Sequence, residues 1–294
     1  MDTFPWCKPI VPYLRPPATG NVEATLERLM GEAETYSERH RQLASIRFYL
    51  RQALTQCANG WQGLAHGITN YATLLDQIRH HTKASERVCF VTFNYDTLFD
   101  NALRSIGMRL DTMDDHVSDG CFTYVKIHGS VDWGRSIRTS LTTPFTASDS
   151  ALISEVLSHA GNISLGDYER NGQLPIAKTA VAILFPAIAI PLERKLDFEC
   201  PKAQLDALDH ALVRATKLLI IGWRAADAPF TELLRERLTR SAVRAYVVAG
   251  NENEAREVVD RLNSNLNLKG VDHFPGNGFT EFVVQRAGEP FLTS

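Results

Sequence analysis

Apolar residues run almost without a break in several short segments of this chain, and polar residues follow each run. The first run, VCFVTF at 88–93, is followed by Asn94, Tyr95 and Asp96 with no turn glycine between them. The others are FTYVKI at 122–127, AVAILF at 180–185, LLIIGW at 218–223 and RAYVVAG at 244–250. Near-continuous apolar runs are typical of strands that are buried on both faces, so each run predicts a strand. FTEFVV at 279–284 is predicted as a last strand that closes the sheet.

Helical periodicity fills most of the remaining chain. Residues 21–84 have apolar positions at helical spacing, beginning with Asn21 as an N-cap and with Val22, Leu26 and Leu29 on one face. Later helices are predicted at TLFDNALRSIG, ALDHALVRATK, TELLRERLTRS and NEAREVVDRLNSNL. Residues 135–178 are rich in Ser, Thr and Asp and have weak periodicity, which predicts an insertion or a loop-dominated subdomain.

The alternation of strands and helices after residue 88 predicts the fold class. It indicates an α/β fold with a doubly wound, mostly parallel sheet of the Rossmann-like kind, in which AVAILF is one of the sheet strands. We expect residues 1–20, which are proline-rich, to form an irregular segment, and residues 21–290 to form a single domain. That domain would contain a helical part at 21–84 and the insertion at 135–178.

Charge and cysteine content narrow the class of protein. The chain has 31 Lys and Arg against 34 Asp and Glu, a net charge of −3, so no global basic field attracts nucleic acid or an anionic membrane. The five cysteines are odd in number and form no C-x-x-C pair, which favours free thiols over disulfides or a zinc site. No run of about 18 uncharged apolar residues is present. We therefore expect a cytoplasmic protein without membrane or nucleic-acid partners.

Polar residues and glycines stand directly after the predicted strands. They are Asn94 and Asp96, then His128, Gly129 and Ser130, then Gly222, Trp223 and Asp227, and finally Asn251. The carboxyl ends of parallel strands meet at one edge of a sheet, where ligands bind. Each residue has a structural alternative: Asn94, Asp96 and Asn251 are good helix caps, and a histidine before a glycine is often bound to turn backbone. Their coincidence at one edge favours a shared site.

Two of these blocks carry a family likeness. TFNYDTLFDNAL, followed by KIHGSVDW, resembles the sirtuin-like domains of bacterial and phage-defence proteins. AIAIPLERKLDFECP and LLIIGWRAADAPFTELL are similar to later blocks of that family, and the resemblance covers roughly residues 21–285. It implies a sirtuin-type fold that binds NAD.

The resemblance also implies roles for individual residues. Asn94 would contact the nicotinamide ribose and position a water, Asp96 would support the nicotinamide end, and His128 would be the general base. Gly222 would let the backbone approach NAD, and Asn251 would bind the adenosine ribose. The remaining family positions that would line the pocket are Gly129, Ser130, Trp223 and Asp227, the last without an assigned role.

This chain departs from the family pattern in two ways. Residues 129–199 contain no cysteine, so we expect no zinc module and disfavour a protein deacylase. No glycine-rich phosphate loop precedes residue 85. Either an N-terminal piece is missing, through a start site placed too far downstream or a real truncation, or this member has lost its phosphate loop; we favour the missing piece. A Rossmann-type sheet without its first strand is expected to leave a hydrophobic slot beside the neighbouring strands.

The combined interpretation is a domain that hydrolyses NAD to nicotinamide and ADP-ribose in an anti-phage defence or toxin system. A histidine that titrates near neutrality suits the deprotonation of an oxygen nucleophile. The alternative is a catalytically impaired module that binds NAD or ADP-ribose, and a protein deacylase is a weaker third possibility. A homo-oligomer and a partner defence protein are both compatible with the sequence.

Overall fold

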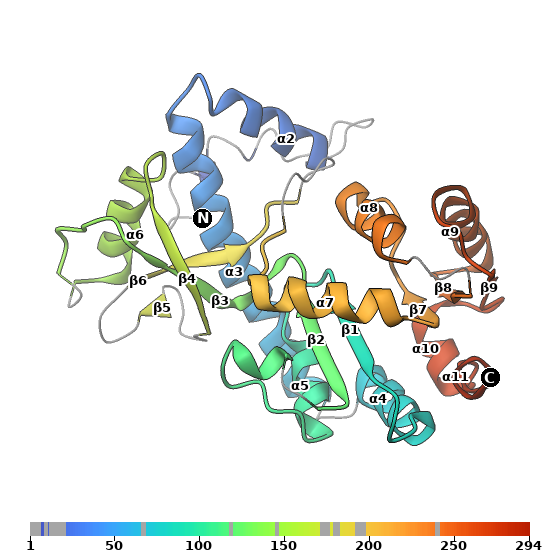
Figure 1. Cartoon of the computed structure of the whole chain (residues 1–294). Coiled ribbons are helices and arrows are strands. Elements are labelled where there is room, and N and C mark those ends of the chain that lie inside the picture. Colours follow the sequence, from blue (N-terminus) through green and yellow to red (C-terminus); the bar gives the residue numbers. More distant parts are fainter. Residues whose placement is uncertain are drawn as a thin grey trace.

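The computed structural model describes residues 7–8, 11, 22–65, 69–117, 120–144, 147–170, 177–178, 183–191, 198–238 and 242–294. Parallel strands with helices on both sides form one part of the molecule, and an antiparallel sheet packed against long helices forms the other (Figure 1). The predicted irregular segment 1–20 lies almost wholly outside the described residues. No helix in the described part is long and apolar enough to cross a bilayer.

Among the described residues, long helices precede the first strand, in agreement with the periodicity of residues 21–84. They are α2 (Val22–Glu32), α3 (Glu38–Ala65) and α4 (Asn70–His81). The hydroxyl of Thr69 caps α4 by accepting a hydrogen bond from the amide of Ala72 at 3.1 Å. Leu26 and Leu29 of α2 are buried with residues of α3 in a core that belongs to the antiparallel part.

Two parallel sheets carry the strands that the apolar runs predict. The first sheet pairs β1 (Val88–Thr92) with β2 (Phe122–Lys126). The second has the order β7-β8-β9 and consists of β7 (Lys217–Ile221), β8 (Arg244–Val248) and β9 (Gly270–His273). Strand β9 was not predicted, because the short sequence GVDH contains no apolar run.

Helices cover both faces of these strands, which confirms the doubly wound α/β class. On one face, α7 (Lys202–Arg214), α8 (Ala228–Arg237) and α9 (Glu252–Asn265) share a hydrophobic core with β2 and β8. On the other face lie α4, α5 (Leu98–Ser105) and α10 (Gly278–Val284), followed by the short α11 (Glu289–Thr293). Hydrophobic cores on both faces of the sheets therefore hold the carboxyl ends of the parallel strands in place.

The predicted place of AVAILF in the parallel sheet is wrong. Its described part belongs to β6 (Ile183–Ile188), which runs antiparallel to β3 (Gly129–Ile137) in a separate sheet of order β4-β3-β6-β5. The other strands are β4 (Leu165–Arg170) and β5 (Ala177–Lys178). All six residues of β6 are buried. A fully buried strand has a continuous apolar sequence whether its sheet is parallel or antiparallel, so the sequence does not distinguish the two.

The region predicted as a loop-dominated insertion contains regular structure. It includes the end of β3, the helix α6 (Asp149–Ser158), β4 and β5. Helix α6 buries Leu152, Ile153, Val156 and Leu157 against α2 and α3. Helix α6 is short and lies between polar loops. The polar composition of residues 135–178 therefore concealed its apolar positions.

The predicted strand 279–284 is also wrong, because these residues form helix α10. Phe282 and Val283 are buried, whereas Val284 is 72% exposed. Phe279 also packs against the same core, and its spacing to Phe282 and Val283 is that of one helical face. A short apolar segment does not distinguish the two periodicities by itself.

Candidate functional site

His128 and Asp227 form the central pair of the candidate site. His128 follows β2, and its Nε2 atom lies 3.1 Å from Oδ2 of Asp227, the residue that precedes α8. The other carboxylate oxygen of Asp227 accepts a hydrogen bond from the amide of Phe230 at 3.0 Å and caps the helix. Both side chains are largely buried, with 5% and 11% exposed. Asp227 is thus a helix cap and a histidine partner at once.

The position of Asp227 favours its ionised form and orients the imidazole. The amino end of α8 carries a partial positive charge, which stabilises a carboxylate there. An anionic Asp227 accepts a hydrogen bond from Nε2–H of His128, and in that tautomer the lone pair is on Nδ1. The pair can therefore hold a neutral histidine whose Nδ1 takes up a proton.

Aromatic side chains enclose this pair. Phe93, directly after β1, is stacked on Trp223, two residues after β7, with ring centroids 5.5 Å apart and an interplanar angle of 11°. The ring of Phe93 also meets His128 edge-on at 5.1 Å and Phe230 at 5.0 Å. These contacts join the ends of β1, β2 and β7 around the histidine and limit the access of water to it.

Asn94 follows β1, and the two residues on either side of it contact the ring of His128. Its neighbours Phe93 and Tyr95 both contact the ring of His128, with centroid distances of 5.1 and 6.2 Å. The side chain of Asn94 is exposed, and it lies near enough to Tyr71 of α4 to lower the pKa of that hydroxyl, against a larger rise that burial causes. No hydrogen bond between Asn94 and His128 occurs among the contacts of the described residues. The two predicted catalytic residues therefore follow neighbouring strands without a direct bond.

Asp96 occupies a capping position, and a buried lysine holds its backbone. The Oδ1 atom of Asp96 accepts a hydrogen bond from the amide of Leu98 at 2.9 Å, as the capping alternative expected. Its carbonyl accepts a hydrogen bond from Nζ of Lys126 at 2.5 Å, and the same Nζ lies 2.9 Å from Oδ2 of Asp100. Lys126 and Asp100 are fully buried, and the hydroxyl of Tyr124 also donates to Asp100. This network fixes the loop that carries Asn94.

Gly129 and Ser130 lie behind the histidine in the buried start of β3. Gly129 has φ +82°, and a Cβ there would come within 2.0 Å of the carbonyl oxygen of Ala187. The hydroxyl of Ser130 donates to Oδ1 of Asp132 at 2.5 Å, and Arg170 donates to Oδ2 at 2.7 Å. Burial raises the pKa of Asp132, as does the charge of Asp100. In this conformation both residues support the strand and do not face open space.

The loop after β7 provides open space beside the pair. Gly222 has φ +68° and nothing within 4 Å of the position of a Cβ, so its conformation requires glycine while its surroundings stay empty. Ala225 also has a positive φ of 52°, which is uncommon for a residue with a side chain. Arg261 of α9 fixes this loop by donating to the carbonyl of Arg224 at 2.8 Å.

Asn251 caps α9 at the neighbouring strand end. Its Oδ1 accepts a hydrogen bond from the amide of Glu254 at 3.1 Å, and its Nδ2 donates to Oε1 of Glu254 at 3.0 Å. This is again the structural alternative that the sequence left open. Among the described contacts, Asn251 has no bond to the His128 pair.

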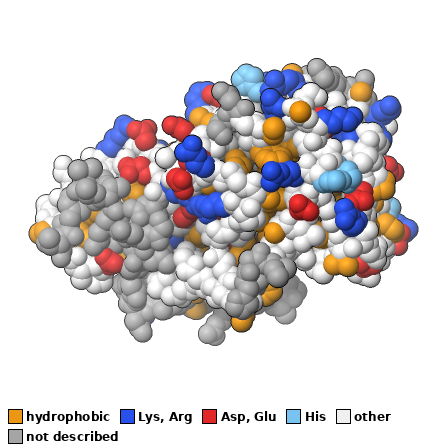
Figure 2. All heavy atoms as spheres, turned by 90° about the horizontal axis from the view of Figure 1, so that it is seen from below, with side chains coloured by type: hydrophobic (Ala, Val, Ile, Leu, Met, Phe, Trp, Pro, Cys, Tyr) orange, Lys and Arg blue, Asp and Glu red, His pale blue; other side chains and the backbone are white. Residues whose placement is uncertain are grey.

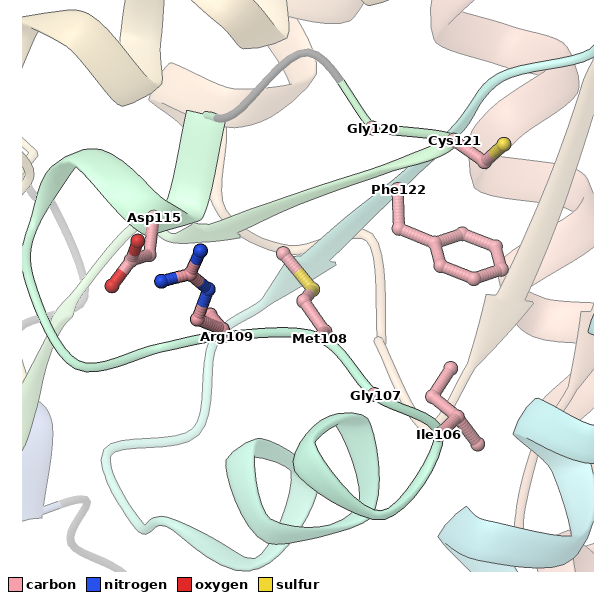
Figure 3. A pocket seen from close by; sticks show the side chains of 8 residues that line it. All are labelled: Ile106, Gly107, Met108, Arg109, Asp115, Gly120, Cys121 and Phe122. Carbon is pink, nitrogen blue, oxygen red and sulfur yellow. The ribbon is translucent and has the colours of Figure 1, made fainter.

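Two surface cavities lie near the parallel strands. One, of about 440 Å³, is lined by Met108, Arg109, Cys121 and Phe122 among others, at the amino end of β2 and thus opposite the candidate site (Figure 3). The second, of about 250 Å³, lies between α8 and α9 and includes Ala225 and Ala226 of the strained loop. Seen from below, Lys and Arg are interspersed with Asp and Glu around apolar side chains (Figure 2). Among the described residues of that face, the two signs of charge are mixed.

No group of three or more His, Cys, Asp or Glu side chains that could hold a metal ion occurs in the described part of the chain. The described polar groups at the site are a histidine, a carboxylate and backbone amides, and this set suits an organic ligand better than a cation. The position of a Cβ at Gly222 is empty, and aromatic rings lie beside His128.

The fold and this pair define an α/β protein with a histidine–carboxylate site at the carboxyl edge of parallel strands. The model of the SIR2-like domain family matches residues 88–272, more than half of the chain. The chain belongs to this family and is a sirtuin-like, NAD-related domain. The match runs from β1 into β9 and contains both His128 and Asp227. No curated protein matches the chain.

Sequence reasoning missed several residues that shape the site. Lys126 had a usable signal, since a lysine within the apolar run FTYVKI implies a buried counter-charge if the strand is covered on both faces. Phe93 appeared only as a core residue, and Tyr71, in a helix before the first strand, has no signal that links it to Asn94. Its contact depends on how α4 packs against the parallel strands.

Proposed function

We propose that this domain hydrolyses NAD to nicotinamide and ADP-ribose. The observation that carries the proposal is the His128–Asp227 pair within a SIR2-like domain. Hydrolysis breaks the bond between nicotinamide and its ribose carbon, and a water oxygen forms the new bond to that carbon. His128 accepts the proton that the water loses, and Asp227 stabilises the imidazolium that results.

Other residues around the pair support this reaction. Phe93 and Trp223 exclude bulk water from the histidine, and Gly222 leaves room for a ligand at the loop after β7. Asn94 orients the water once its side chain turns from Tyr71 toward the bound substrate. An amide suits that position, because it donates and accepts hydrogen bonds without placing a negative charge near the base.

The direct test is the release of nicotinamide from NAD by the purified chain. We expect His128→Ala to lower the rate by about 10²–10⁴-fold, the usual contribution of a general base. The matched control is His210→Ala, which removes an exposed histidine on α7 and leaves the rate unchanged. Equal release by the His128→Ala variant would show that the reaction does not depend on this base.

A second candidate function is a module that binds NAD or ADP-ribose without turnover. The proximity of the Asn94 side chain to Tyr71 favours it, because an interaction with that hydroxyl competes with the positioning of water. In that case NAD raises the melting temperature, since a ligand that prefers the folded state stabilises it, and nicotinamide is not released. Tyr71→Phe distinguishes the two: it frees Asn94 and increases turnover only if the site is catalytic.

The biological setting that we propose is an anti-phage defence or toxin system in the cytoplasm that acts by depletion of NAD. Expression of the intact chain should then lower cellular NAD and slow growth, and His128→Ala should relieve both effects. A deacylase is a weaker candidate, because residues 129–199 lack the cysteines of a zinc module. An acetylated-peptide assay on the same preparation tests it.

A further inference from the structure

Three polar side-chain atoms in the core behind the candidate site have no hydrogen-bond partner among the described residues. They are Oδ1 of Asp100, Nε2 of His116 and Nε1 of Trp133. All three residues are 0% exposed, so bulk solvent does not reach these atoms. Burial of a polar group without a hydrogen bond is costly, and buried polar atoms of folded proteins are almost always paired with protein groups or with ordered water.

The three residues come from different elements and lie in one cluster. Asp100 is on α5, His116 is in the 3-10 turn η2 (Asp114–Val117), and Trp133 is on β3. The imidazole of His116 meets the indole of Trp133 edge-on, with ring centroids 5.2 Å apart. It also stacks on the ring of Tyr124 at 5.6 Å, and the hydroxyl of Tyr124 donates to Oδ2 of Asp100 at 2.9 Å. His116 therefore lies between Trp133 and the Tyr124–Asp100 pair.

The contacts of His116 determine which of its nitrogens carries the hydrogen. Its Nδ1 lies 3.3 Å from the carbonyl oxygen of Thr112, and a carbonyl only accepts, so Nδ1 is the donor of this bond. Burial lowers the pKa of His116 to about 4, while the charge of the nearby Asp100 acts in the opposite direction. The imidazole is therefore neutral near pH 7, and Nε2 has a lone pair that accepts a hydrogen bond.

The three unpaired atoms accordingly consist of one donor and two acceptors. The indole N–H of Trp133 only donates, whereas the carboxylate of Asp100 and Nε2 of His116 only accept. A water molecule matches this set, because it accepts from one group and donates its two hydrogens to the others. A cation would face the N–H of Trp133, and an anion would face a carboxylate and a lone pair. Buried waters typically make about three hydrogen bonds to polar groups that the protein does not pair.

We propose that one water molecule is bound between α5, η2 and β3, where it accepts a hydrogen bond from Nε1 of Trp133 and donates to Oδ1 of Asp100 and to Nε2 of His116. This internal water is a permanent part of the folded domain, since it satisfies three groups that no side chain of the described core reaches.

The water would complete the hydrogen bonds of Asp100. Oδ2 of this residue already accepts from the hydroxyl of Tyr124 and from Nζ of Lys126, both at 2.9 Å. The same Nζ donates to the carbonyl of Asp96, in the loop that carries Asn94. The water thus joins η2 and β3 to the buried lysine that holds this loop.

Crystals of the intact chain test the geometry directly and need no variant. We expect electron density for one water within about 3.2 Å of all three atoms. Absence of density at this position would overturn the proposal. Side chains turned so that two of the three atoms bond each other directly, or anomalous scattering from a chloride or metal ion at the position, would also overturn it.

Solution NMR tests whether the water is held. The chain has four tryptophans, so Trp133→Phe identifies the indole signal of Trp133 by its loss. If that variant does not fold, phenylalanine at each of the other three tryptophans identifies the signal by elimination. We expect cross-peaks from this N–H to water that have opposite signs in NOESY and ROESY spectra, the pattern of a held water. The indole of Trp61, which is 57% exposed, is the matched control and should not show that pattern.

His116→Phe removes one of the two acceptors and should abolish the cross-peak between the Trp133 indole and water. His210→Phe changes an exposed histidine on α7 and should leave the cross-peak unchanged. A cross-peak that persists undiminished in a folded His116→Phe variant would overturn the three-way bridge, as would the lack of any cross-peak in the parent chain. None of these readouts depends on NAD hydrolysis.

Discussion

Nε2 of His128 and Oδ2 of Asp227 lie 3.1 Å apart although 99 residues separate them in the chain. The first residue ends a strand of one parallel sheet, and the second begins the helix after a strand of the other. The pair therefore spans the division between the two sheets. Any change that moves one sheet relative to the other alters this distance and, with it, the orientation of the imidazole.

Asp227→Asn separates the charge of this residue from its capping role. Asparagine still caps α8 by accepting from the amide of Phe230, so we expect little change in melting temperature. Loss of the carboxylate removes the stabilisation of the imidazolium, and nicotinamide release should fall at least tenfold, about 1.4 kcal/mol in activation free energy. Asp209→Asn, which removes a surface partner of Arg237, is the matched control. Unchanged turnover in Asp227→Asn would leave the carboxylate a purely structural role.

Lys126→Met should destabilise the fold by about 3–5 kcal/mol, because it leaves the carboxylate of Asp100 buried without its partner. Adding Asp100→Asn removes that charge and should recover part of the loss, since the amide oxygen still accepts from Tyr124. Lys202→Met breaks an exposed pair with Asp206 and should cost less than about 1 kcal/mol. Urea unfolding monitored by circular dichroism measures all three. Equal stability of the single and double variants would contradict the proposed cause.

Two glycine substitutions should differ sharply although both positions have positive φ. Gly222→Ala meets no atom within 4 Å and should cost about 1–2 kcal/mol from its backbone conformation alone. Gly129→Ala adds a Cβ that lies 2.0 Å from the carbonyl oxygen of Ala187, so the backbone of β3 and β6 must separate. We expect it to unfold the antiparallel sheet or to prevent soluble expression. Similar melting temperatures for the two variants would show that this contact relaxes easily.

His116 should make stability fall below neutral pH. Burial lowers the pKa of His116 from 6.5 to about 4; the charge of Lys126 acts in the same direction, whereas that of Asp100 opposes it. The unfolded chain therefore binds a proton near pH 6.5 that the folded chain resists until about pH 4. Stability attributable to this residue is full above pH 6.5 and is lost between these values, by about 3 kcal/mol in total.

His116→Phe tests this pH dependence. Phenylalanine keeps an aromatic ring beside Tyr124, which stacks on His116 at 5.6 Å, and removes the titrating group. Urea unfolding at pH 7 and pH 4.5 should show a smaller difference in the variant than in the parent chain. An identical pH slope would assign the acid sensitivity to other groups.

The sequence by itself determined the strands and helices that form the site edge. The apolar runs at β1, β2, β7 and β8 pack against helices on two faces, and that requirement is visible in the order of residues. It also indicated that polar residues meet at the carboxyl ends of these strands.

Only the tertiary structure decided which polar residues pair and which strands join. Asp96 and Asn251 accept hydrogen bonds from helix amides, Asp227 is both a cap and the partner of His128, and Asn94 lies beside Tyr71. The apolar run of β6 belongs to an antiparallel sheet, and 279–284 is a helix, because short apolar runs satisfy several kinds of burial. The order of residues along the chain determines which of them must be buried. The partner of each buried or polar group depends instead on distant segments that packing brings together.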